Sequence, residues 1–531
     1  MTRDGLLAAG RLARTACLTT LMACAITPAG ADLSERLERG EAVTIVVLGD
    51  SLAAGWELPD PARDGYPGVF EAILQRRYPA ARVRVISTGV PGDTARGGAA
   101  RVESEVGARR PDAVVVQFGG NDHGARRSPA AFRRDLEMIL GRIRERGAAV
   151  VLATPPIAEP EPETPMVAAV REVGRAQAVP VADFDAAIRR HGTGPRGAFP
   201  RGRHPGRHLH AVMARELDAA FARLSGPAPR LEVSIARGAR QVVQGEAVPV
   251  TVNVRAEGAG PVAVCLECDG ERREQSVATD RDGRASAVFG LPVTGRGRTE
   301  SRRLLAWARR ERAFGCDVGW LTFAPVVEAG GAGGALGQEG LVVGRERWGG
   351  AADLSGRFAV AAAGETLCLS VEVRDDRAPR RALRRASHES DCVEVFLDLR
   401  GPEDQGRPCW DAGVVGLMVH PGVKPGEAPS WRPLDGSPQG WQPLALRGAL
   451  LPDGYRVEVD LPAAPFRERL AVAGDTIGFD IALDDADDDR GRKCQMVWAG
   501  GADDYIDPSL FGGLTLQPAP DGKPRVRVVV R

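Results

Sequence analysis

Between residues 42 and 225, short apolar segments alternate with amphipathic segments. Five valine-rich apolar runs are too short for helices: residues 43–48, 83–86, 113–117, 149–153 and 179–182. Helical periodicity fills the intervals, in residues 66–78, 95–106, 129–146, 166–176 and 208–224. Buried strands that alternate with helices are typical of a parallel sheet covered on both faces. The pattern predicts a doubly wound, flavodoxin-like α/β domain with five parallel strands, residues 41–226.

The pattern changes after the Pro-Ala-Pro boundary at residues 227–229. Apolar and polar positions then alternate between Gly and Asp turns, in residues 231–235, 248–254, 261–266 and 285–291. This alternation predicts a small immunoglobulin-like β-sandwich, residues 228–325. Residues 326–340 are rich in Gly and Ala and favour a flexible linker. Strand patterns dominate again from residue 341 and predict a second, larger β-sandwich, residues 341–518.

Composition limits the classes of function. The chain has 531 residues, more than one hydrophobic core usually serves, which agrees with several domains. Seventy basic and seventy acidic residues give a net charge of zero. The chain therefore has no global basic field that would gather nucleic acid or anionic lipid, and we expect no nucleic-acid partner.

The N-terminus has the layout of a secretory signal peptide. Three arginines precede an uncharged stretch and a triplet of small residues: Arg3, Arg11, Arg14, residues 15–28 and residues 29–31. We expect residues 1–31 to be removed and the mature chain to be secreted or periplasmic. A lipid anchor at Cys24 is the alternative, because residues 21–24 loosely resemble a lipobox. No later apolar run approaches the roughly 20 residues that span a bilayer, so we expect no transmembrane segment.

Removal of residues 1–31 would leave seven cysteines, an odd number, so at least one thiol would lack a partner within the chain. Cys265 and Cys268 have the spacing of a zinc knuckle. A zinc site needs a second pair, however, and only Cys316 is near in sequence. We therefore expect a disulfide or buried thiols at these positions.

Polar motifs follow three of the predicted strands and precede the last helix. They are Gly49-Asp50-Ser51-Leu52, Gly89-Val90-Pro91-Gly92-Asp93-Thr94, Gly119-Gly120-Asn121-Asp122 and His204-Pro205. A serine directly after a strand presents its hydroxyl above the sheet edge while its own N–H points into the same pocket. Active sites of doubly wound domains lie beyond the carboxyl ends of the strands. We therefore expect the four motifs to meet in one site.

With these motifs, residues 42–225 resemble the SGNH, or GDSL-type, hydrolase family, a flavodoxin-like group of esterases and lipases. The resemblance makes Ser51 the nucleophile and His204 the general base. It assigns the oxyanion hole to the N–H groups of Ser51 and Gly92 and to the side-chain amide of Asn121. The chemistry agrees, because a serine hydroxyl needs a neighbouring imidazole to take its proton, and converging N–H donors stabilise the tetrahedral intermediate. The resemblance implies no metal or cofactor for catalysis.

One position departs from the family pattern. The family usually has an aspartate three residues before the histidine, where this sequence has Arg201. Loss of such an acid costs about 10⁴ in rate in the serine proteases. Three replacements are open: a Ser51–His204 dyad oriented by a backbone carbonyl, an acid such as Asp183 or Asp185, or His208 as the base. The dyad is preferred, and His208 and His210 are expected at the helix surface.

The C-terminal sandwich resembles the family 9 carbohydrate-binding modules, over about residues 341–516. The resemblance rests on dispersed positions: Trp348, residues 364–367, Asp375-Asp376, and residues 391–398, 454–458 and 484–487. In that family tryptophans sandwich a sugar, and acidic loops often hold calcium. Trp410, Trp431 and Trp441 are the candidate sugar-binding residues, with core packing as the alternative for each. Residues 484–489 do not follow the EF-hand pattern, so a solvated turn is the default interpretation and a structural calcium site is the alternative.

Together these features predict a secreted serine esterase that removes acetyl or other short acyl groups from a polysaccharide. The sugar-binding sandwich would hold the enzyme near its substrate and raise the local substrate concentration. One alternative is a general carboxylesterase or lipase that acts on small lipid esters. The other is a non-catalytic glycan-binding protein with a degenerate hydrolase domain, for which Arg201 is the evidence.

Overall fold

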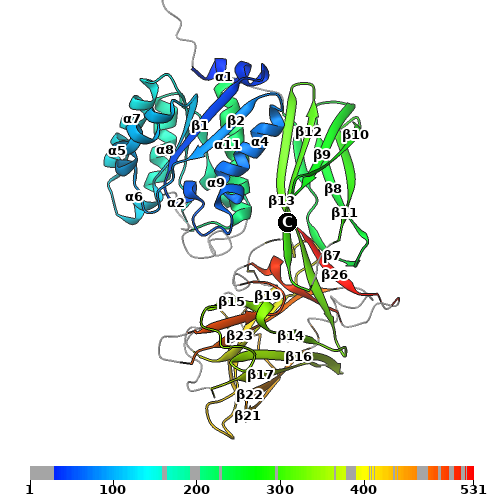
Figure 1. Ribbon diagram of the computed structural model, residues 1–531. Helices are drawn as coiled ribbons and strands as arrows, with labels where there is room; N and C mark the ends of the chain where they lie inside the picture. The colour runs from blue at the N-terminus through cyan, green and yellow to red at the C-terminus, as the bar shows by residue number, and fades with distance from the viewer. Residues whose placement is uncertain are drawn as a thin grey trace, which may run out of the picture.

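The computed structural model contains an α/β domain followed by two β-sandwiches (Figure 1). It describes residues 29–157, 164–191, 204–225, 230–293, 297–363, 366–377, 390–405, 407, 410–411, 413–434, 437–438, 441–462, 464, 476–487, 492–501, 507–515, 521 and 523–531. The expected signal peptide lies outside the described residues up to residue 28, as do Arg201 and Cys409.

Five parallel strands form the sheet of the α/β domain, in the order β2-β1-β3-β4-β5. They are β1 (Ala42–Gly49), β2 (Arg82–Ser87), β3 (Ala113–Gln117), β4 (Ala149–Ala153) and β5 (Val181–Ala182). This order is that of the flavodoxin-like folds, in which the strand order reverses between β1 and β3. The predicted fold class is confirmed.

Helices cover both faces of this sheet. One hydrophobic cluster contains side chains of α1 (Ala29–Glu38), α4 (Tyr66–Arg77), α9 (Phe184–Arg190) and α11 (Arg207–Ala222). Another contains side chains of α5 (Ala95–Glu105), α7 (Pro129–Arg144) and α8 (Pro165–Ala176). Both faces of β1 and β3 are therefore buried, which explains their unbroken runs of valine.

The middle sandwich packs two sheets around one core. Its strands are β6 (Glu232–Ile235), β7 (Gly238–Val243), β8 (Ala247–Arg255), β9 (Gly260–Cys268), β10 (Glu271–Thr279), β11 (Arg284–Pro292), β12 (Glu300–Arg310), β13 (Ala313–Glu328) and β26 (Arg525–Val530). The last strand of the chain, β26, lies between β7 and β13. The middle sandwich is therefore completed by β26, which follows the C-terminal sandwich in the sequence.

The C-terminal sandwich also has two sheets around one core. Its strands are β14 (Gly334–Leu336), β15 (Leu341–Val343), β16 (Leu354–Ala363), β17 (Thr366–Asp375), β18 (Cys392–Asp398), β19 (Val414–His420), β20 (Ser430–Pro433), β21 (Ala445–Leu451), β22 (Gly454–Pro462), β23 (Ile477–Asp485), β24 (Cys494–Val497) and β25 (Gly512–Thr515). Its larger sheet joins the middle sandwich, because β13 pairs with β25.

The expected flexible linker, residues 326–340, is ordered into secondary structure instead. It contains the end of β13, the strand β14 and a short 3₁₀ helix, Gln338–Gly340. Backbone hydrogen bonds hold it, from the N–H of Ala329 to the carbonyl of Thr515 and from the N–H of Gly330 to that of Val360, at 2.9 and 2.6 Å. Because these backbone groups have hydrogen-bond partners, the segment forms regular structure despite its Gly- and Ala-rich composition.

The middle sandwich also packs against the α/β domain. Trp307, Phe314 and Trp320 share one hydrophobic cluster with α4 and α11. Arg76 of α4 forms two hydrogen bonds with the carboxylate of Glu267 on β9, at 2.7 and 2.8 Å. These contacts fix the α/β domain on the middle sandwich.

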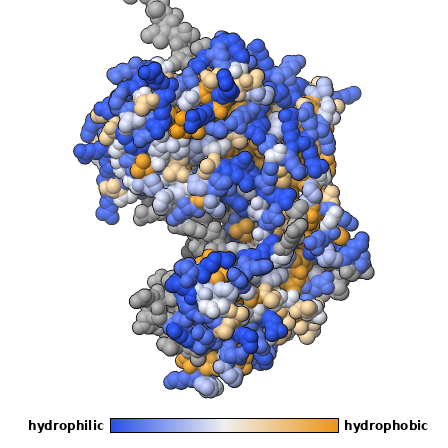
Figure 2. Space-filling view, viewed as in Figure 1, coloured by the Kyte–Doolittle hydropathy of each residue, from blue (hydrophilic) through white to orange (hydrophobic). Residues whose placement is uncertain are grey.

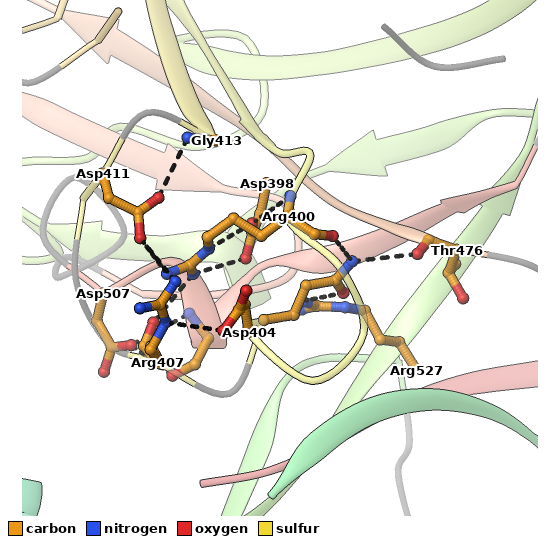
Figure 3. Close-up of polar contacts among 11 residues, drawn as sticks. Asp398, Arg400, Asp404, Arg407, Asp411, Gly413, Thr476, Asp507 and Arg527 are labelled. Atoms are coloured by element: carbon orange, nitrogen blue, oxygen red, sulfur yellow. Dashed lines mark hydrogen bonds and ion pairs between the residues drawn. The ribbon is translucent and has the colours of Figure 1, made fainter. Parts of the chain in front are cut away.

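A buried arginine of β26 connects the middle and C-terminal sandwiches (Figure 3). Arg527 donates to the carbonyl of Phe511 at 2.6 Å and to Gln405 Oε1 at 3.0 Å. Gln405 in turn donates to the carbonyl of Arg400, whose guanidinium pairs with Asp398 at 2.8 Å. The backbone of β26 thus pairs within the middle sandwich, whereas its Arg527 guanidinium binds groups of the C-terminal sandwich.

Cys265 and Cys268 are both buried free thiols. Cys265 and Cys268 lie three residues apart on β9, so their side chains point to opposite faces of the strand and enter different hydrophobic clusters. Of the two alternatives from sequence, buried thiols are therefore the correct one.

Mostly hydrophilic residues cover the face of the molecule seen in Figure 2. Among the described residues, none of the helices has the length and apolar character needed to cross a membrane.

Candidate active site

Ser51 begins a short helix directly after β1. Asp50 caps this helix, α2 (Ser51–Ala54), by accepting a hydrogen bond from the N–H of Leu52 at 2.9 Å. Gly49 precedes the cap, and a Cβ atom at this position would lie 2.7 Å from Ala53 Cβ and 2.9 Å from the carbonyl of Gln117. Only glycine therefore allows β1 to turn so closely into α2.

Asp50 is almost completely buried. Burial raises the pKa of its carboxyl to about 7, although the hydrogen bonds from Leu52 and Gln117 oppose this effect. Its role is to shape the turn that carries Ser51, and the side chain of Ser51 itself is buried.

His204 lies against Ser51. Its Nε2 is 2.9 Å from Ser51 Oγ, within hydrogen-bonding distance. His204 comes three residues before the start of α11, which packs on α4 and α9. The structure therefore brings together the two residues that the sequence predicted as nucleophile and base.

The other ring nitrogen of His204 faces a carboxylate. His204 Nδ1 is 3.1 Å from Glu57 Oε2, in the turn that follows α2. Glu57 is not among the site residues predicted from the sequence. No sequence motif marks this residue, because its contact with His204 joins positions 147 residues apart.

The loops after β2 and β3 carry the predicted oxyanion donors, Gly92 and Asn121, and a hydrogen bond joins the two loops. Gly92 has φ +79°, a conformation that favours glycine. The Asn121 side chain donates from Nδ2 to the carbonyl of Asp93 at 2.8 Å, which ties the two loops together. Asn121 lies in a short helix, Gly120–Gly124, directly after the turn at Gly119, where φ is +129°.

Arg101 of α5 holds the ends of β1 and β2 in register. Its guanidinium donates to the carbonyls of Thr88 and Gly49 at 2.6 and 2.7 Å and to Asp93 Oδ2 at 2.8 Å. The segments that carry Ser51 and Gly92 therefore share one rigid support.

The replacements considered for the missing acid have other partners. Asp183 pairs with Arg171 at 2.8 Å, and Asp185 pairs with Arg189 at 2.9 Å. The dyad oriented by a backbone carbonyl is wrong as well, because His204 Nδ1 faces Glu57. His208 is not the residue placed at Ser51.

His210 is buried, which corrects the expectation of a surface position. Its Nδ1 accepts a hydrogen bond from the N–H of Tyr66 at 3.1 Å, and burial lowers its pKa to about 3. His210 is therefore a neutral core histidine. His208 is half-buried beside His191, with 6.0 Å between the ring centroids.

The three candidate sugar-binding tryptophans do not share one face of the C-terminal sandwich. Trp431 and Trp441 are half-buried against the core between its two sheets. Trp410 packs on the opposite face of the larger sheet, against Phe396. A single stacked sugar site made of all three is not present.

Aspartates gather at one end of the C-terminal sandwich, and their oxygens approach one another within 4.8 Å in small groups. One group is Asp375, Asp391 and Asp485, and another is Asp353, Asp376 and Asp487. Burial raises the pKa of Asp375 to about 8 and that of Asp485 to about 7. Asp375 Oδ2 and both carboxylate oxygens of Asp485 are buried without a hydrogen-bond partner. Carboxylate oxygens are the ligands that Ca²⁺ prefers, so the donor set fits this cation.

Lys493 supplies part of the compensating charge. Its ammonium group donates to Asp487 at 2.6 Å and to Asp353, and it lies 3.5 Å from Asp485. The group formed by Asp375, Asp391 and Asp485 is thus the better candidate for a cation.

The α/β domain and the C-terminal sandwich each match a family model. Residues 47–212 match the GDSL-like Lipase/Acylhydrolase family. The N-terminal domain is a GDSL-type domain. Residues 447–519 match the model described as carbohydrate family 9 binding domain-like. Both resemblances found in the sequence are confirmed.

Curated relatives of the GDSL domain are esterases by name. Esterase TesA of Pseudomonas aeruginosa is 32% identical over 117 residues, which cover 22% of this chain and 55% of the relative. An acetylxylan esterase of Geobacillus stearothermophilus is 32% identical over 93 residues, which cover 18% and 42%. The chain spans about half the length of the curated relatives it matches. A solved structure of an acetylxylan esterase from Geobacillus stearothermophilus aligns with 34% of this chain and 94% of its own, at 22% identity and a TM-score of 0.31.

Proposed function

We propose that the protein is a serine esterase that removes acetyl or other short acyl groups from a polysaccharide. The observation that carries the proposal is the 2.9 Å contact between Ser51 Oγ and His204 Nε2. It lies at the sheet edge to which the loops of Gly92 and Asn121 also belong. A nucleophile, a base and oxyanion donors at one edge are what acyl transfer requires.

Acylation begins with proton transfer from Ser51 Oγ to His204 Nε2. The oxygen attacks the ester carbonyl carbon, and the negative charge moves to the carbonyl oxygen. The N–H groups of Ser51 and Gly92 and the second Nδ2–H of Asn121 stabilise this charge. The intermediate collapses to acyl-Ser51, and His204 returns the proton to the sugar oxygen that leaves.

Deacylation repeats these steps with water as the nucleophile. His204 takes a proton from water, and the hydroxide oxygen attacks the acyl carbon. The second intermediate releases the carboxylic acid and restores the Ser51 hydroxyl. Each step uses side chains and backbone groups of this chain.

Three observations support a polysaccharide substrate. The match to the carbohydrate-binding family covers residues 447–519, and one relative is named an acetylxylan esterase. In addition, α2 lies at the end of the GDSL domain nearest to the C-terminal sandwich (Figure 1). This placement supports a polymer that contacts both domains.

The test compares the mature protein with Ser51→Ala. Hydrolysis of p-nitrophenyl acetate and release of acetate from acetylated xylan are expected for the wild type and absent for the variant. Rates that fall with acyl chain length favour the short-acyl esterase. Rates that rise with chain length favour the lipase alternative, and equal background rates for both proteins contradict an enzymatic function.

We also propose that the chain is exported, on the basis of the three-part layout of residues 1–31. N-terminal sequencing of the protein recovered from its native compartment tests this. A first residue at Asp32 agrees with signal cleavage, and a lipidated Cys24 agrees with an anchor instead. A retained Met1 would contradict export.

A further inference from the structure

The base of a serine hydrolase needs a partner on its second ring nitrogen. Such a partner fixes the tautomer in which Nε2 carries the lone pair, and it stabilises the imidazolium that forms during the reaction. At the position where the family usually has this acid, the sequence has Arg201. The structure instead places Glu57 Oε2 3.1 Å from His204 Nδ1.

The backbone around Glu57 is bent in a way that local sequence does not favour. Glu57 has φ +68°, a left-handed conformation that costs a residue other than glycine about 1–2 kcal/mol. Gly55, two residues earlier, is also left-handed, with φ +66°. Strain of this kind persists where the surrounding structure holds it, and it is frequent at active sites.

Hydrogen bonds attach this turn to the helix of the nucleophile. The N–H of Trp56 donates to the carbonyl of Ser51 at 3.0 Å, and the N–H of Gly55 donates to that of Leu52 at 3.1 Å. The N–H of Leu58 closes the turn on the carbonyl of Gly55 at 3.1 Å. The carboxylate of Glu57 is therefore held on the same rigid unit as Ser51.

The carboxylates of Asp60 and Asp64, which are close to Glu57 in sequence, contact groups other than His204. Asp60 caps the helix Pro61–Asp64 by accepting from the N–H of Arg63 at 3.1 Å. Asp64 is buried and lies 3.6 Å from the guanidinium of Arg63. Among the acids near Ser51 in the described part of the chain, Glu57 is the one in contact with His204.

We propose that Glu57 is the positioning residue of the catalytic histidine, in place of the acid that the family carries three residues before the histidine. This inference rests on the proposed function. The acid and the nucleophile then belong to one segment of seven residues, and the histidine alone comes from the distant segment. Nδ1–H of His204 donates to Glu57, and the proton stays on the ring throughout the reaction.

The side chain of Glu57 is 31% exposed, so water weakens its effect relative to a buried acid. We therefore expect a smaller loss than the ~10⁴ seen for the buried acid of serine proteases. In Glu57→Gln, kcat for p-nitrophenyl acetate should fall by about 10²- to 10³-fold, with KM within twofold of the wild type. Glu57→Asp should recover part of this loss, because it retains the charge on a shorter stem.

The experiment measures kcat, KM and thermal unfolding for the full-length protein and for Glu57→Gln, Glu57→Asp and Asp60→Asn. Asp60→Asn is the matched control, because it removes a charge from the same loop while an asparagine still caps the helix. A second readout is the rate at which a fluorophosphonate labels Ser51, which should fall in parallel with kcat. The unfolding temperature of Glu57→Gln should remain within a few degrees of the wild type.

The outcomes separate this inference from the proposed function. An active wild type whose Glu57→Gln variant keeps kcat within twofold overturns the role of Glu57 and leaves the esterase intact. A wild type no more active than Ser51→Ala overturns the proposed function and this inference with it. Equal losses in Glu57→Gln and Asp60→Asn, with lowered unfolding temperatures, show a structural role of the loop and also overturn the inference.

Discussion

The side-chain amide of Asn121 has two N–H groups, one of which holds the side chain in place while the other is the proposed oxyanion donor. One Nδ2–H donates to the carbonyl of Asp93 at 2.8 Å, and the amide carries a second N–H. Asn121→Ala should lower kcat for p-nitrophenyl acetate by about 10²- to 10³-fold with little change in KM, because the donor acts on the charge of the intermediate. Asn253→Ala is the matched control, since Asn253 lies on β8 and accepts from Ser286. A loss below twofold in Asn121→Ala would contradict the assignment.

Trp56 directly precedes Glu57, and 51% of its surface is exposed. A large exposed ring beside a catalytic turn is suited to stack on the C–H face of a pyranose. Trp56→Ala should raise KM for acetylated xylan about tenfold, a loss of about 1.4 kcal/mol. KM for p-nitrophenyl acetate should stay within twofold. Met138→Ala, at an exposed position of α7, is the control, and equal changes for both substrates would contradict a sugar platform.

At the residue scale, the sequence predicted those site residues that stand directly beside a predicted strand or helix. Ser51, Gly92 and Asn121 each follow a strand, and His204 leads into a helix, so their meeting point could be predicted from topology. Glu57 could not be found in this way. Its role depends on a left-handed turn and on a partner far along the chain, neither of which local patterns indicate.

The cap of α2 makes the stability of the domain depend on pH. The pKa of Asp50 rises from 3.8 in the unfolded chain to about 7 in the folded domain, so the folded state binds the extra proton between these values. The free energy of unfolding therefore falls as pH rises through this window, relative to a variant without the carboxyl. Asp50→Asn keeps a capping side chain. Urea unfolding should show a larger gain in stability for Asp50→Asn at pH 7.5 than at pH 4.5, and a gain that is equal at both would contradict this.

The ends of β17 and β23 carry the aspartates that fit a calcium ion. Because ligands must be deprotonated, and the pKa values of Asp375 and Asp485 are about 8 and about 7, Ca²⁺ should raise the unfolding temperature more at pH 8.5 than at pH 6. Asp375→Asn should remove this effect, whereas Asp453→Asn, an exposed turn variant, should keep it. Calorimetry in CaCl₂ and in EDTA measures the unfolding temperature at each pH. Unfolding temperatures that are the same in CaCl₂ and in EDTA at both pH values would rule out the site.

At the element scale, the strands and helices of the GDSL domain were predictable because each has a clear period. His210 was placed at the surface because of its residue type. Its position three and seven residues before Met213 and Leu217, both buried, already put it on the apolar stripe of α11. The periodicity was the better guide, because a neutral histidine with one hydrogen bond is tolerated in a core.

Across the whole molecule, Arg527 couples two sandwiches through one buried side chain. Arg527→Ala would leave the carbonyl of Phe511 and the amide oxygen of Gln405 without their donor. We expect a loss of at least about 2 kcal/mol in the free energy of unfolding, shared by both sandwiches. Arg525→Ala, on the same strand and paired with Asp521, is the control. Denaturation followed by tryptophan fluorescence tests this, and a loss confined to one sandwich would contradict the coupling.

The connections between domains were the part that the sequence did not reveal. β26 pairs with β7, about 280 residues earlier, and such pairing leaves no local signal. The segment expected to be a flexible linker forms β14 because its partner β16 and the hydrogen bonds of Ala329 and Gly330 are supplied by tertiary structure.

The position of β26 has a consequence for biosynthesis. The ribosome makes β26 only after the C-terminal sandwich, yet β26 is an inner strand of a domain whose other strands were made long before. Until β26 has been made, β7 and β13 each expose an unpaired edge, which is a hazard for aggregation. A stop codon anywhere in the C-terminal sandwich would therefore damage two domains. If the chain is exported, a pathway that keeps it unfolded until it is complete would suit this topology.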